Sequence, residues 1–322
     1  MRIIQKPSCF VTGCAGNVGS HLTATLLRAN CIVTGIDNFF SGTPDNMQDF
    51  TMNPNFYFYQ GSITDSHLLD TIFAKHGPFS TVFHLAAIIS VPYSMDHADE
   101  TMRINHEASL ALHSRARKNG QGTFVFAGSA AEYGRPLARP AREADAGDPV
   151  SPYGVSKHLV SRAIEDSGYG AALRFFNIYG PTRAKPGPYD GVVRLFLNRA
   201  ERGRAPVVLG DGGQVRDFLF LRDAVEALMR AAGLKGGRPL SGIYNVGTGK
   251  GTSIMQLAHH VRTLYGLTED IGSGPERPGD IRFSVADAGK LLAATGWMPG
   301  TLMERGLPRT VEGMRRLGVA AG

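Results

Sequence analysis

The chain of 322 residues has few cysteines, one tryptophan and no long apolar run. Its three cysteines, Cys9, Cys14 and Cys31, cannot all pair with one another, and none has zinc-ligand spacing. We expect them to be reduced, buried small residues. No apolar run approaches the roughly 20 residues that span a bilayer, and the start of the chain lacks the apolar stretch of a secretion signal. A cytoplasmic location follows by default.

A large excess of one charge is also missing, because the net charge is only +6. With 43% hydrophobic and 19% charged residues, the composition is that of an ordinary soluble globular protein. Arginines nevertheless recur late in the chain, at positions 174, 183, 194, 216, 222, 277 and 282. They form either a solvated basic surface or a pocket for an anionic, phosphate-bearing ligand. They are too sparse to indicate nucleic acid, and no nucleic-acid motif is present.

Short apolar runs alternate with amphipathic segments through the first 180 residues. The apolar runs predict strands at 9–12, 31–37, 56–63, 81–87, 123–129 and 171–179. The amphipathic segments predict helices at 20–29, 66–76, 97–118 and 152–166. Nearly continuous apolar strands that alternate with helices are typical of a parallel sheet covered on both faces. We therefore predict an α/β fold with a doubly wound sheet of the Rossmann type.

The character of the chain changes after residue 180, where the stretch 181–191 is rich in glycine and proline and predicts a loop. Beyond it we expect helices near 192–202 and 223–232, strands at 207–209 and 242–246, a helix at 253–265, and short elements at the end. We assign residues 1–180, with the strand and helix near 242–265, to the larger domain. Most of 181–322 then forms a smaller α/β lobe at the carboxyl edge of the sheet, where ligands bind in such folds.

A glycine-rich turn follows the first predicted strand. Gly13, Gly16 and Gly19 stand directly after that strand and directly before a helix. The first glycine permits a tight turn, the second lets the backbone approach a pyrophosphate, and the third lets the helix pack closely on the strand. Asn17 and Val18 belong to the same turn, where the helix N-terminus stabilises phosphate charge. The pattern indicates a dinucleotide site, against the alternative of a glycine-rich turn without a ligand.

Asp37 and the residues after it favour NAD over NADP. Asp37 ends the second predicted strand at about the 20 residues downstream that a dinucleotide site requires. A carboxylate there accepts both ribose hydroxyls and repels a 2′-phosphate. The following residues, Asn38, Phe39 and Phe40, include no arginine that could hold such a phosphate. We therefore expect NAD as the cofactor.

A phenol and an ammonium stand four residues apart, at Tyr153 and Lys157. On a helix they share one face. The ammonium, together with the positive nicotinamide ring, would lower the pKa of Tyr153, so that its phenolate could take a proton from a substrate hydroxyl near neutral pH. Ser129, at the end of a predicted strand, can supply a second hydroxyl to the same substrate oxygen. Such a pair is commonly a surface pair, but its place after the fifth strand of a dinucleotide fold favours catalysis.

With these motifs the sequence resembles the extended short-chain dehydrogenases/reductases, in the branch of nucleotide-sugar epimerases and dehydratases. The resemblance runs from about residue 8 to about residue 314. The motifs that carry it are TGCAGNVG at 12–19, DN at 37–38, HLAA at 84–87, GSAAEYG at 128–134, YGVSK at 153–157, RFFNIYGP at 174–181, GDGGQVRDF at 210–218, NVGTG at 245–249 and RPGD at 277–280.

The resemblance implies a role for each matching residue. Tyr153 would be the acid/base, Lys157 would hold the nicotinamide ribose, and Ser129 would polarise the 4-hydroxyl or 4-keto group. The implied NAD ligands are Gly13, Gly16, Asn17, Val18, Gly19, Asp37, Asn38, Ser62, Ile63, Leu85, Ala86, Ala87, Tyr153 and Lys157. The implied ligands of a nucleotide sugar are Ser90, Ser129, Asn177, Val193, Val208, Arg216 and Arg277. We expect no metal site.

Structural roles stay open for some of these residues. Asn177 could cap the turn at Gly180, and Arg216 could pair with Asp217 or Asp223. We interpret His84 and Trp297 as core residues rather than site residues. The sugar itself is not identified, because the side chains that read its substituents, with Ser90, Tyr93, Tyr179 and Tyr189 as candidates, cannot be placed from sequence.

The chain departs from the family pattern beside its catalytic serine. Dehydratases of this branch carry an Asp-Glu pair where this chain has Ala130 and Ala131, and the decarboxylases tend to place Glu at the position of Ala131. Elimination of a 6-hydroxyl needs an acid and a base beyond the tyrosine, which alanine cannot supply. Glu132 comes one position later, on the opposite side of an extended chain. Both chemistries are therefore disfavoured.

Two further departures concern the pocket. Ser62 stands where the family often has Asp, which weakens the expected contact with adenine. Ala127-Gly128 replaces a usual pair of serines before the catalytic serine, so we expect the floor of the pocket to differ.

We therefore expect NAD-dependent inversion at C4 of a nucleoside-diphosphate sugar, through a transient 4-keto sugar. The substrate would be a UDP-hexose, a UDP-N-acetylhexosamine or a UDP-hexuronate. The alternatives are dehydration, decarboxylation or 4-keto reduction of such a sugar, and a nucleotide-sensing or scaffold protein, against which the intact Ser129, Tyr153 and Lys157 argue. The resemblance also implies a homodimer through the helices at about 97–118 and 152–166.

Overall fold

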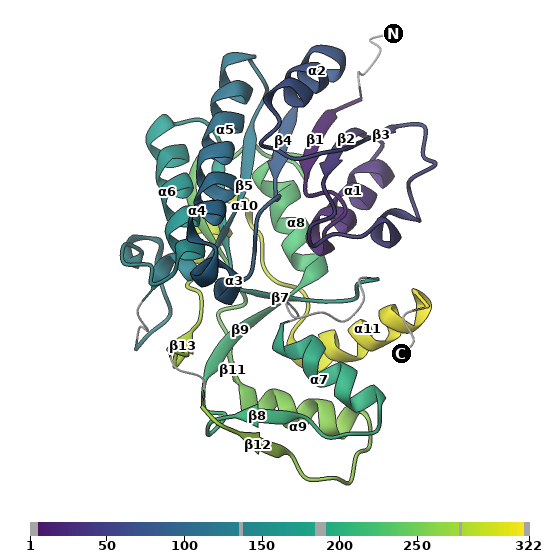
Figure 1. The fold of residues 1–322 in the computed structure, drawn as a ribbon, viewed down its shortest axis with the longest axis vertical. Coiled ribbons are helices and arrows are strands. Elements are labelled where there is room, and N and C mark those ends of the chain that lie inside the picture. Colours follow the sequence, from purple (N-terminus) through teal and green to yellow (C-terminus); the bar gives the residue numbers. More distant parts are fainter. Residues whose placement is uncertain (1–5, 135–137, 184–190, 277–278, 319–322) are drawn as a thin grey trace.

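The computed structural model describes residues 6–134, 138–183, 191–276 and 279–318. Its larger part is built on a parallel sheet of seven strands in the order β10-β6-β5-β4-β1-β2-β3 (Figure 1). The strands are β1 (Ser8–Thr12), β2 (Ile32–Asp37), β3 (Phe56–Gln60), β4 (Thr81–His84), β5 (Phe124–Ser129), β6 (Ala171–Phe175) and β10 (Gly242–Val246). The chain order reverses between β1 and β4, which places the ligand crevice at their carboxyl ends. The predicted doubly wound fold is confirmed.

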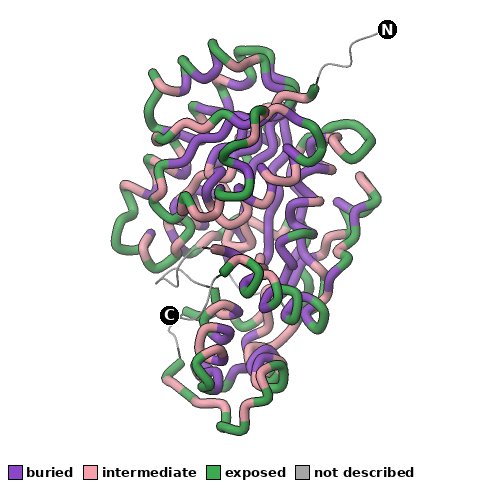
Figure 2. Tube along the Cα trace, turned by 90° about the vertical axis from the view of Figure 1, so that its right-hand side faces the viewer, coloured by how far each residue is buried: buried purple, intermediate pink, exposed green. Residues whose placement is uncertain are grey.

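Helices cover both faces of this sheet, because its strands are apolar on both sides. Buried residues of α1 (Asn17–Arg28), α8 (Leu221–Ala231) and α10 (Gly289–Thr295) form one core cluster with the sheet. Buried residues of α2 (Ser66–His76), α5 (Ala108–Lys118) and α6 (Pro152–Ser167) form a second cluster on the other face. Figure 2 shows the resulting buried layer of central strands.

The smaller lobe has its own sheets and its own core. Strand β9 (Val215–Phe220) pairs with β7 (Asn177–Tyr179), β11 (Gly251–Ser253) and β13 (Phe283–Ser284), while β8 (Val207–Leu209) pairs with β12 (Gly272–Gly274). The helices of this lobe are α7 (Val192–Glu201), α9 (Ile254–Leu264) and α11 (Met303–Arg316), whose buried faces form a third cluster. Short helices complete the described chain: η1 (Pro44–Met47), α3 (Val91–Asp96), α4 (Ala98–Met102), η2 (Arg103–Glu107), η3 (Ala130–Tyr133) and η4 (Glu143–Asp145).

The division of the chain differs from the sequence-based one. Helix α9 belongs to the smaller lobe rather than the larger domain, since its Leu257 and Val261 lie in the third cluster. Helix α8 instead covers the large sheet, with Ala224 and Leu228 in the first cluster. The last described helix, α11, is 14 residues long, so the expectation of only short elements at the end was wrong.

Several predicted elements end or break earlier than expected. The strand at 81–87 ends at His84, and the residues after it form a loop. The strand at 171–179 breaks at Phe176, whose N–H donates to the Val246 carbonyl, before β7 joins β9 in the other lobe. The helix at 97–118 contains the π-helical turn η2. There the amide of Asn105 binds both backbone groups of Ile88 at 2.8 Å.

The polar and sulfur-bearing core residues behave as expected. Cys9, Cys14 and Cys31 are buried and free, and Trp297 lies in the core. His84 is buried between the hydroxyls of Thr12 and Ser109, each at 2.7 Å, and burial lowers its pKa to about 3. Within the described residues, no helix is long and apolar enough to cross a membrane, and no cluster of His, Cys, Asp or Glu could hold a metal ion.

Asp217 of β9 joins the two lobes. Its buried carboxylate accepts hydrogen bonds from the backbone N–H groups of Thr248 and Gly249, at 2.8 and 2.9 Å, in the loop that follows β10 of the large sheet. It also accepts the N–H of Ala286 at 3.1 Å. A buried carboxylate with this many donors is fully satisfied, whereas donors left without it would be costly.

We expect Asp217→Asn to destabilise the protein by about 2–4 kcal/mol, because an amide replaces one of two accepting oxygens and leaves buried N–H donors unpaired. Denaturant unfolding would measure the change. Asp270→Asn, at a side chain that is 99% exposed, is the matched control and should change the free energy of unfolding by less than about 0.5 kcal/mol. Equal effects of the two substitutions would contradict this role of Asp217.

Candidate functional site

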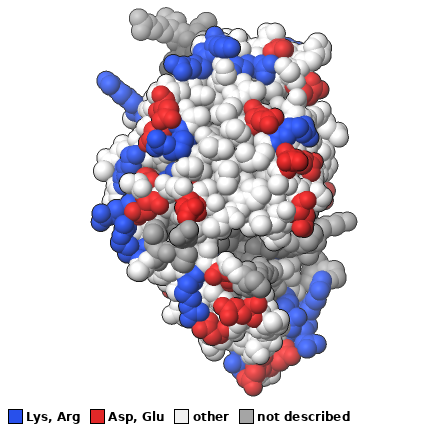
Figure 3. Space-filling model, turned by 60° about the vertical axis from the view of Figure 1, so that its left-hand side comes forward, with Lys and Arg blue, Asp and Glu red and all other residues white. Residues whose placement is uncertain are grey.

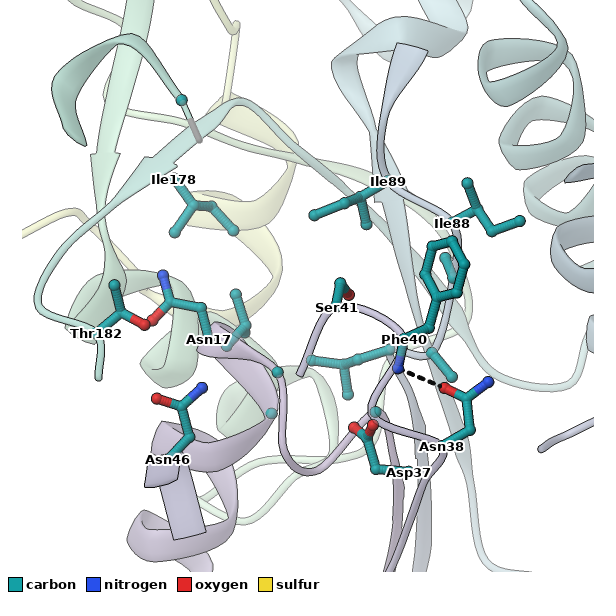
Figure 4. Close-up of a pocket in the computed structure, with 18 of the residues that line it drawn as sticks. Asn17, Asp37, Asn38, Phe40, Ser41, Asn46, Ile88, Ile89, Ile178 and Thr182 are labelled. Atoms are coloured by element: carbon teal, nitrogen blue, oxygen red, sulfur yellow. Dashed lines mark hydrogen bonds between the residues drawn. The ribbon is translucent and has the colours of Figure 1, made fainter. Parts of the chain in front are cut away.

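A cavity of about 800 Å³ opens at the carboxyl ends of β1, β2 and β4. Its walls also include β7 and the start of α7 from the smaller lobe. Figure 4 shows Asn17, Asn46 and Thr182 on one side and Phe40, Ile88 and Ile89 on the other. The expected NAD ligands that line it are Gly13, Gly16, Asn17, Val18, Gly19, Asp37, Asn38, Ser62, Ile63, Leu85, Ala86 and Ala87. Asn177 and Val193, two expected substrate ligands, line it as well.

The glycine turn leaves no room for side chains. Gly13 has φ +71°, and a Cβ on it would lie 2.8 Å from the Ala86 nitrogen. A Cβ on Gly19 would lie 1.9 Å from the Gly13 carbonyl oxygen, which no side chain can occupy. Gly16 begins α1 without any side-chain cap, so the N–H groups of the first turn stay available to an anion. The Asn17 Oδ1 atom is buried and makes no hydrogen bond to the described residues. This cradle fits the pyrophosphate of a dinucleotide.

Asp37 is held at the end of β2 by the turns on either side. Its carboxylate accepts the N–H of Ala15 at 2.9 Å and that of Phe39 at 2.8 Å. Burial raises the pKa of Asp37, and these backbone donors oppose that rise. Beside it, the Asn38 amide oxygen accepts the N–H of Phe40 at 3.1 Å (Figure 4). The carboxylate is therefore fixed on the cavity wall, where the sequence placed the ribose partner.

Ser129, Tyr153 and Lys157 come together beside this cavity. Ser129 ends β5, the neighbour of β4, and the two other residues lie one turn apart at the start of α6. The Lys157 Nζ atom donates to the Ala127 carbonyl at 2.8 Å and lies 6.0 Å from the centre of the Tyr153 ring. None of the three is among the residues that line the cavity. The fold thus brings the serine and the helix pair together, as the sequence predicted.

The pKa of Tyr153 is shifted in the direction opposite to the expectation. Burial raises the pKa of Tyr153, a hydrogen bond with Ser129 lowers it, and the charge of Glu132 raises it. Burial also lowers the pKa of Lys157 to about 8. The protein groups by themselves therefore do not lower the pKa of Tyr153, because burial outweighs the hydrogen bond with Ser129. The positive charge of a bound nicotinamide ring is the remaining influence that we expect to lower the pKa of Tyr153.

The other expected substrate ligands are placed less simply. Ser90 caps α3, where its hydroxyl accepts the Tyr93 N–H at 3.1 Å. Val208 is buried in the core of the smaller lobe and does not line the cavity, so its expected contact with the uridine is not supported. Asn177 is exposed at the start of β7, on the cavity wall. Arg277 and Tyr189 lie outside the described residues.

Arg216 pairs with neither of its two expected partners. Its guanidinium forms an ion pair with Asp280 at 2.5 Å and donates to the Ile281 carbonyl. The parallel pairing of β13 with β9 sets Ser284 beside Arg216 and so brings the end of the RPGD motif to it. Two motifs more than 60 residues apart in the chain therefore meet in one place.

The late arginines divide between several roles. Arg174 is buried against Glu132, while Arg183 and Arg282 pair with Asp49 and Asp211. Arg194 lines the cavity. On the face drawn in Figure 3, basic and acidic side chains alternate rather than segregate. Neither of the two initial interpretations, a basic surface or a common anion pocket, describes them all.

Some cavity residues were not found from the sequence. They include Phe40, Ser41, Asn46, Ile88, Ile89 and Thr182. Asn46 bridges the two lobes, since its amide donates to the Ala15 carbonyl at 2.9 Å and accepts the Arg183 N–H at 3.1 Å. It stands in the short helix η1, outside the motifs of the sequence analysis, and the approach of the two segments identifies it. Residues 88–89 follow the HLAA motif directly, and that adjacency is the signal that could have identified them.

Comparison with known proteins settles the family. Residues 9–247 match the NAD dependent epimerase/dehydratase family. The chain belongs to this family. The UDP-glucose 4-epimerase of Mycolicibacterium smegmatis is 33% identical over 312 residues, which cover 95% of this chain and 97% of that protein. A UDP-N-acetyl-alpha-D-glucosaminuronate decarboxylase of Bacillus cytotoxicus is 30% identical over 334 residues, covering 97% and 99%.

Solved structures of epimerases share the whole fold. The UDP-glucose 4-epimerase of Thermotoga maritima, solved with UDP-glucose, matches with a TM-score of 0.88 and 34% identity, over 96% of this chain and 99% of that one. The UDP-glucose 4-epimerase of Thermus thermophilus, solved with NAD, matches with a TM-score of 0.84 and 31% identity, over 96% and 99%. The resemblance inferred from the motifs is confirmed, and NAD is the cofactor of this epimerase/dehydratase family member.

We expect Gly19→Ala to weaken NAD binding about tenfold or more, because the new methyl group would force α1 away from the Gly13 carbonyl and open the phosphate cradle. Titration of the purified protein with NAD, followed by calorimetry, would measure the dissociation constant. Gly147→Ala is the matched control, since nothing lies within 4 Å of a Cβ at that position. An unchanged dissociation constant for Gly19→Ala would contradict the geometry of the cradle.

We expect Lys157→Met to raise the free energy of unfolding at pH 7 by about 1–3 kcal/mol, because it removes a buried ammonium. Lys157 has a folded pKa of about 8, below its ordinary value of 10.5. The unfolded state therefore binds the proton more tightly, and the cost of burial is fully present below pH 8 and fades as the pH rises toward 10.5. Unfolding measured across this range should show the gain shrinking. A loss of stability at pH 7 would refute the argument.

Proposed function

We propose that this protein inverts the configuration at C4 of a UDP-sugar, with a UDP-hexose, UDP-N-acetylhexosamine or UDP-hexuronate as substrate. The observation that carries the proposal is the convergence of Ser129, Tyr153 and Lys157 beside the NAD cavity, together with alanines at positions 130 and 131. The family includes enzymes of several reaction types, and the acid and base that dehydration needs beyond the tyrosine are missing from these two positions.

Each catalytic side chain has a role at the 4-oxygen of the sugar. Tyr153, as its phenolate, removes the 4-hydroxyl proton and later returns it from the phenol form, while the Ser129 hydroxyl donates a hydrogen bond to the same oxygen. The Lys157 ammonium, one turn further along α6, favours the phenolate form of Tyr153. NAD, when bound, supplies the acceptor and donor of hydride. Between the two proton transfers the 4-keto sugar rotates, so that its opposite face is presented for reduction at C4. Return of the proton to the 4-oxygen then completes the 4-epimer.

The two phosphates of the substrate need cations from the smaller lobe. Arg216 and Arg277 are the proposed partners, carried over from the family pattern. Arg216 is already paired with Asp280 and its side chain is only 14% exposed. Binding of a diphosphate there requires the guanidinium to share its donors between Asp280 and phosphate, which a planar fork with five donors allows.

A decarboxylase activity has less support. The relative from Bacillus cytotoxicus is of that type and is about as similar as the epimerases. The family pattern, however, places a glutamate at the position of Ala131 in decarboxylases. Glu132 cannot replace it from where it lies, since its carboxylate is buried against Arg174 rather than free toward a substrate.

We also propose that two copies associate through α4, α5 and α6. Figure 3 shows a broad area without charged side chains on the face where α5 and α6 come forward. Three large apolar residues on or next to α6 and its neighbour α3 are exposed: Met95 of α3 at 59%, Val150 just before α6 at 64% and Leu159 of α6 at 40%. Such a patch on a monomer commonly marks an interface.

Purified protein incubated with UDP-galactose, UDP-N-acetylgalactosamine and UDP-galacturonate should convert at least one of them to its 4-epimer. Separation of the products by chromatography would identify the sugar. A 4-keto product or released carbon dioxide would instead point to dehydration or decarboxylation. If no 4-epimer forms from any UDP-sugar or other nucleoside-diphosphate sugar, the proposed function is wrong.

We expect Tyr153→Phe to lower kcat by about 10²–10⁴-fold, because it removes the group that moves the proton. NAD binding should stay within about twofold of the parent, since the glycine cradle and Asp37 are untouched. Tyr57→Phe, at an exposed tyrosine on β3, is the matched control and should retain full activity. Full turnover by Tyr153→Phe would remove this residue from the mechanism.

A further inference from the structure

A carboxylate is buried directly behind the proposed catalytic serine. Glu132 stands three residues after Ser129, in the short helix η3, and is fully buried. It forms an ion pair at 2.6 Å with Arg174 of β6, whose side chain is 1% exposed. The proposed mechanism makes no use of this pair. Because burying two charges is expensive, such a pair is weak evidence for stability and suggests a different role.

The carboxylate of Glu132 accepts hydrogen bonds from three elements around the end of β5. Its Oε1 atom accepts the Ser129 N–H at 2.9 Å and the Ser161 hydroxyl of α6 at 3.0 Å. Its Oε2 atom accepts the Nε–H of Arg174 at 2.6 Å. The same atoms therefore join the strand that ends in Ser129, the helix that carries Tyr153 and Lys157, and the neighbouring strand β6. Every bond is to a different element, so the carboxylate sets their relative positions.

The space that Glu132 fills explains the unusual residue before the serine. A Cβ on Gly128 would lie 2.7 Å from the Glu132 Oε1 atom, closer than such atoms approach in proteins. A serine at this position, usual in the family, would therefore displace the carboxylate. Gly128 and Glu132 are therefore coupled, because the absence of a side chain at position 128 leaves room for the carboxylate.

We propose that Glu132 is a positioning residue, which fixes Ser129 through its backbone N–H and holds a negative charge behind Tyr153 and Lys157. This inference rests on the proposed function of these three residues. The charge of Glu132 influences both residues of α6. Burial raises the pKa of Tyr153, and the charge of Glu132 adds to this rise. Burial lowers the pKa of Lys157, and the charge of Glu132 opposes this fall. It thereby helps to keep the lysine protonated at the pH where the tyrosine must work.

The other charged and titratable groups around this carboxylate come from several elements. Arg174 faces it from β6, and its guanidinium also lies over the Tyr133 ring at 5.2 Å. On α6, the charge of Glu132 raises the pKa of His158, against the larger lowering by burial. Glu143 of η4 is half-buried; its backbone carbonyl accepts a hydrogen bond from Arg174 at 2.8 Å, while its carboxylate accepts the Asn245 N–H at 2.8 Å. Glu143 does not enter the environment of Tyr153 or Lys157.

The test is the pH dependence of Glu132→Gln. Removal of the negative charge lowers the pKa of both Tyr153 and Lys157, so both limbs of the pH profile of kcat should move to lower pH by about 0.5–1 unit. Loss of the fixed Ser129 should lower kcat at the optimum by about tenfold. The matched control is Glu143→Gln, which removes the carboxylate of a residue whose backbone carbonyl also bonds Arg174 and which should leave the pH profile in place.

A readout without turnover separates this inference from the proposed function. The phenolate absorbance of Tyr153, obtained as the difference between each protein and its Tyr153→Phe counterpart, should titrate at lower pH in Glu132→Gln. If the parent protein epimerises no nucleotide sugar, the proposed function fails while this titration still tests Glu132. A lower melting temperature with an unmoved pH profile and an unmoved phenolate titration would show a purely structural role and overturn the inference.

The single substitution leaves Arg174 buried without its partner and could prevent folding. The double variant Glu132→Gln/Arg174→Gln removes both charges and keeps an amide pair in their place. Because Arg174 is not among the groups that shift the pKa of Tyr153, the double variant should show the same acid shift. Absence of that shift in the folded double variant would equally overturn the proposal.

Discussion

The contact between Gly19 and the Gly13 carbonyl is the constraint on which the rest of the site depends. It draws the uncapped end of α1 onto the turn after β1, so that free N–H groups face the crevice where the strand order reverses. Asp37 is held by the same turn through the Ala15 N–H. One close approach of two backbone segments therefore positions both the phosphate cradle and the ribose carboxylate. No side chain at position 13 or 19 is compatible with it.

The second constraint is the exchange of the chain between two sheets. After β6 the backbone leaves the large sheet, forms β7 beside β9, and later returns as α8 and β10. The cavity lies where these crossings bring the smaller lobe against the carboxyl ends of the strands. Asp217 of β9 connects the smaller lobe to the loop after β10 of the large sheet. Asn46 connects the glycine turn, at Ala15, to the segment that contains Arg183. The cofactor site and the substrate lobe are therefore parts of one packed unit.

Burial works against the chemistry that Tyr153 and Lys157 are proposed to perform. It favours the neutral form of each group, which raises the pKa of the tyrosine and lowers that of the lysine. A carboxylate beneath them partly reverses the effect on the lysine. Glu132 can serve in this way only because Arg174, Ser161 and the Ser129 N–H satisfy it, and only because Gly128 leaves it room. Gly128, one departure of this chain from the family pattern, and the Glu132–Arg174 pair thus belong to one connected arrangement.

The sequence by itself determined the doubly wound fold, the NAD cradle and the identity of the residues that meet beside it, because these depend on local periodicity and short motifs. It did not determine where strands end, which lobe each of α8 and α9 joins, or that Val208 is core and Arg216 pairs with Asp280. Those features depend on which distant segments touch. The pKa directions of Tyr153 and Lys157 were likewise decided only in the tertiary structure, since desolvation is a property of the packed environment and not of residue spacing.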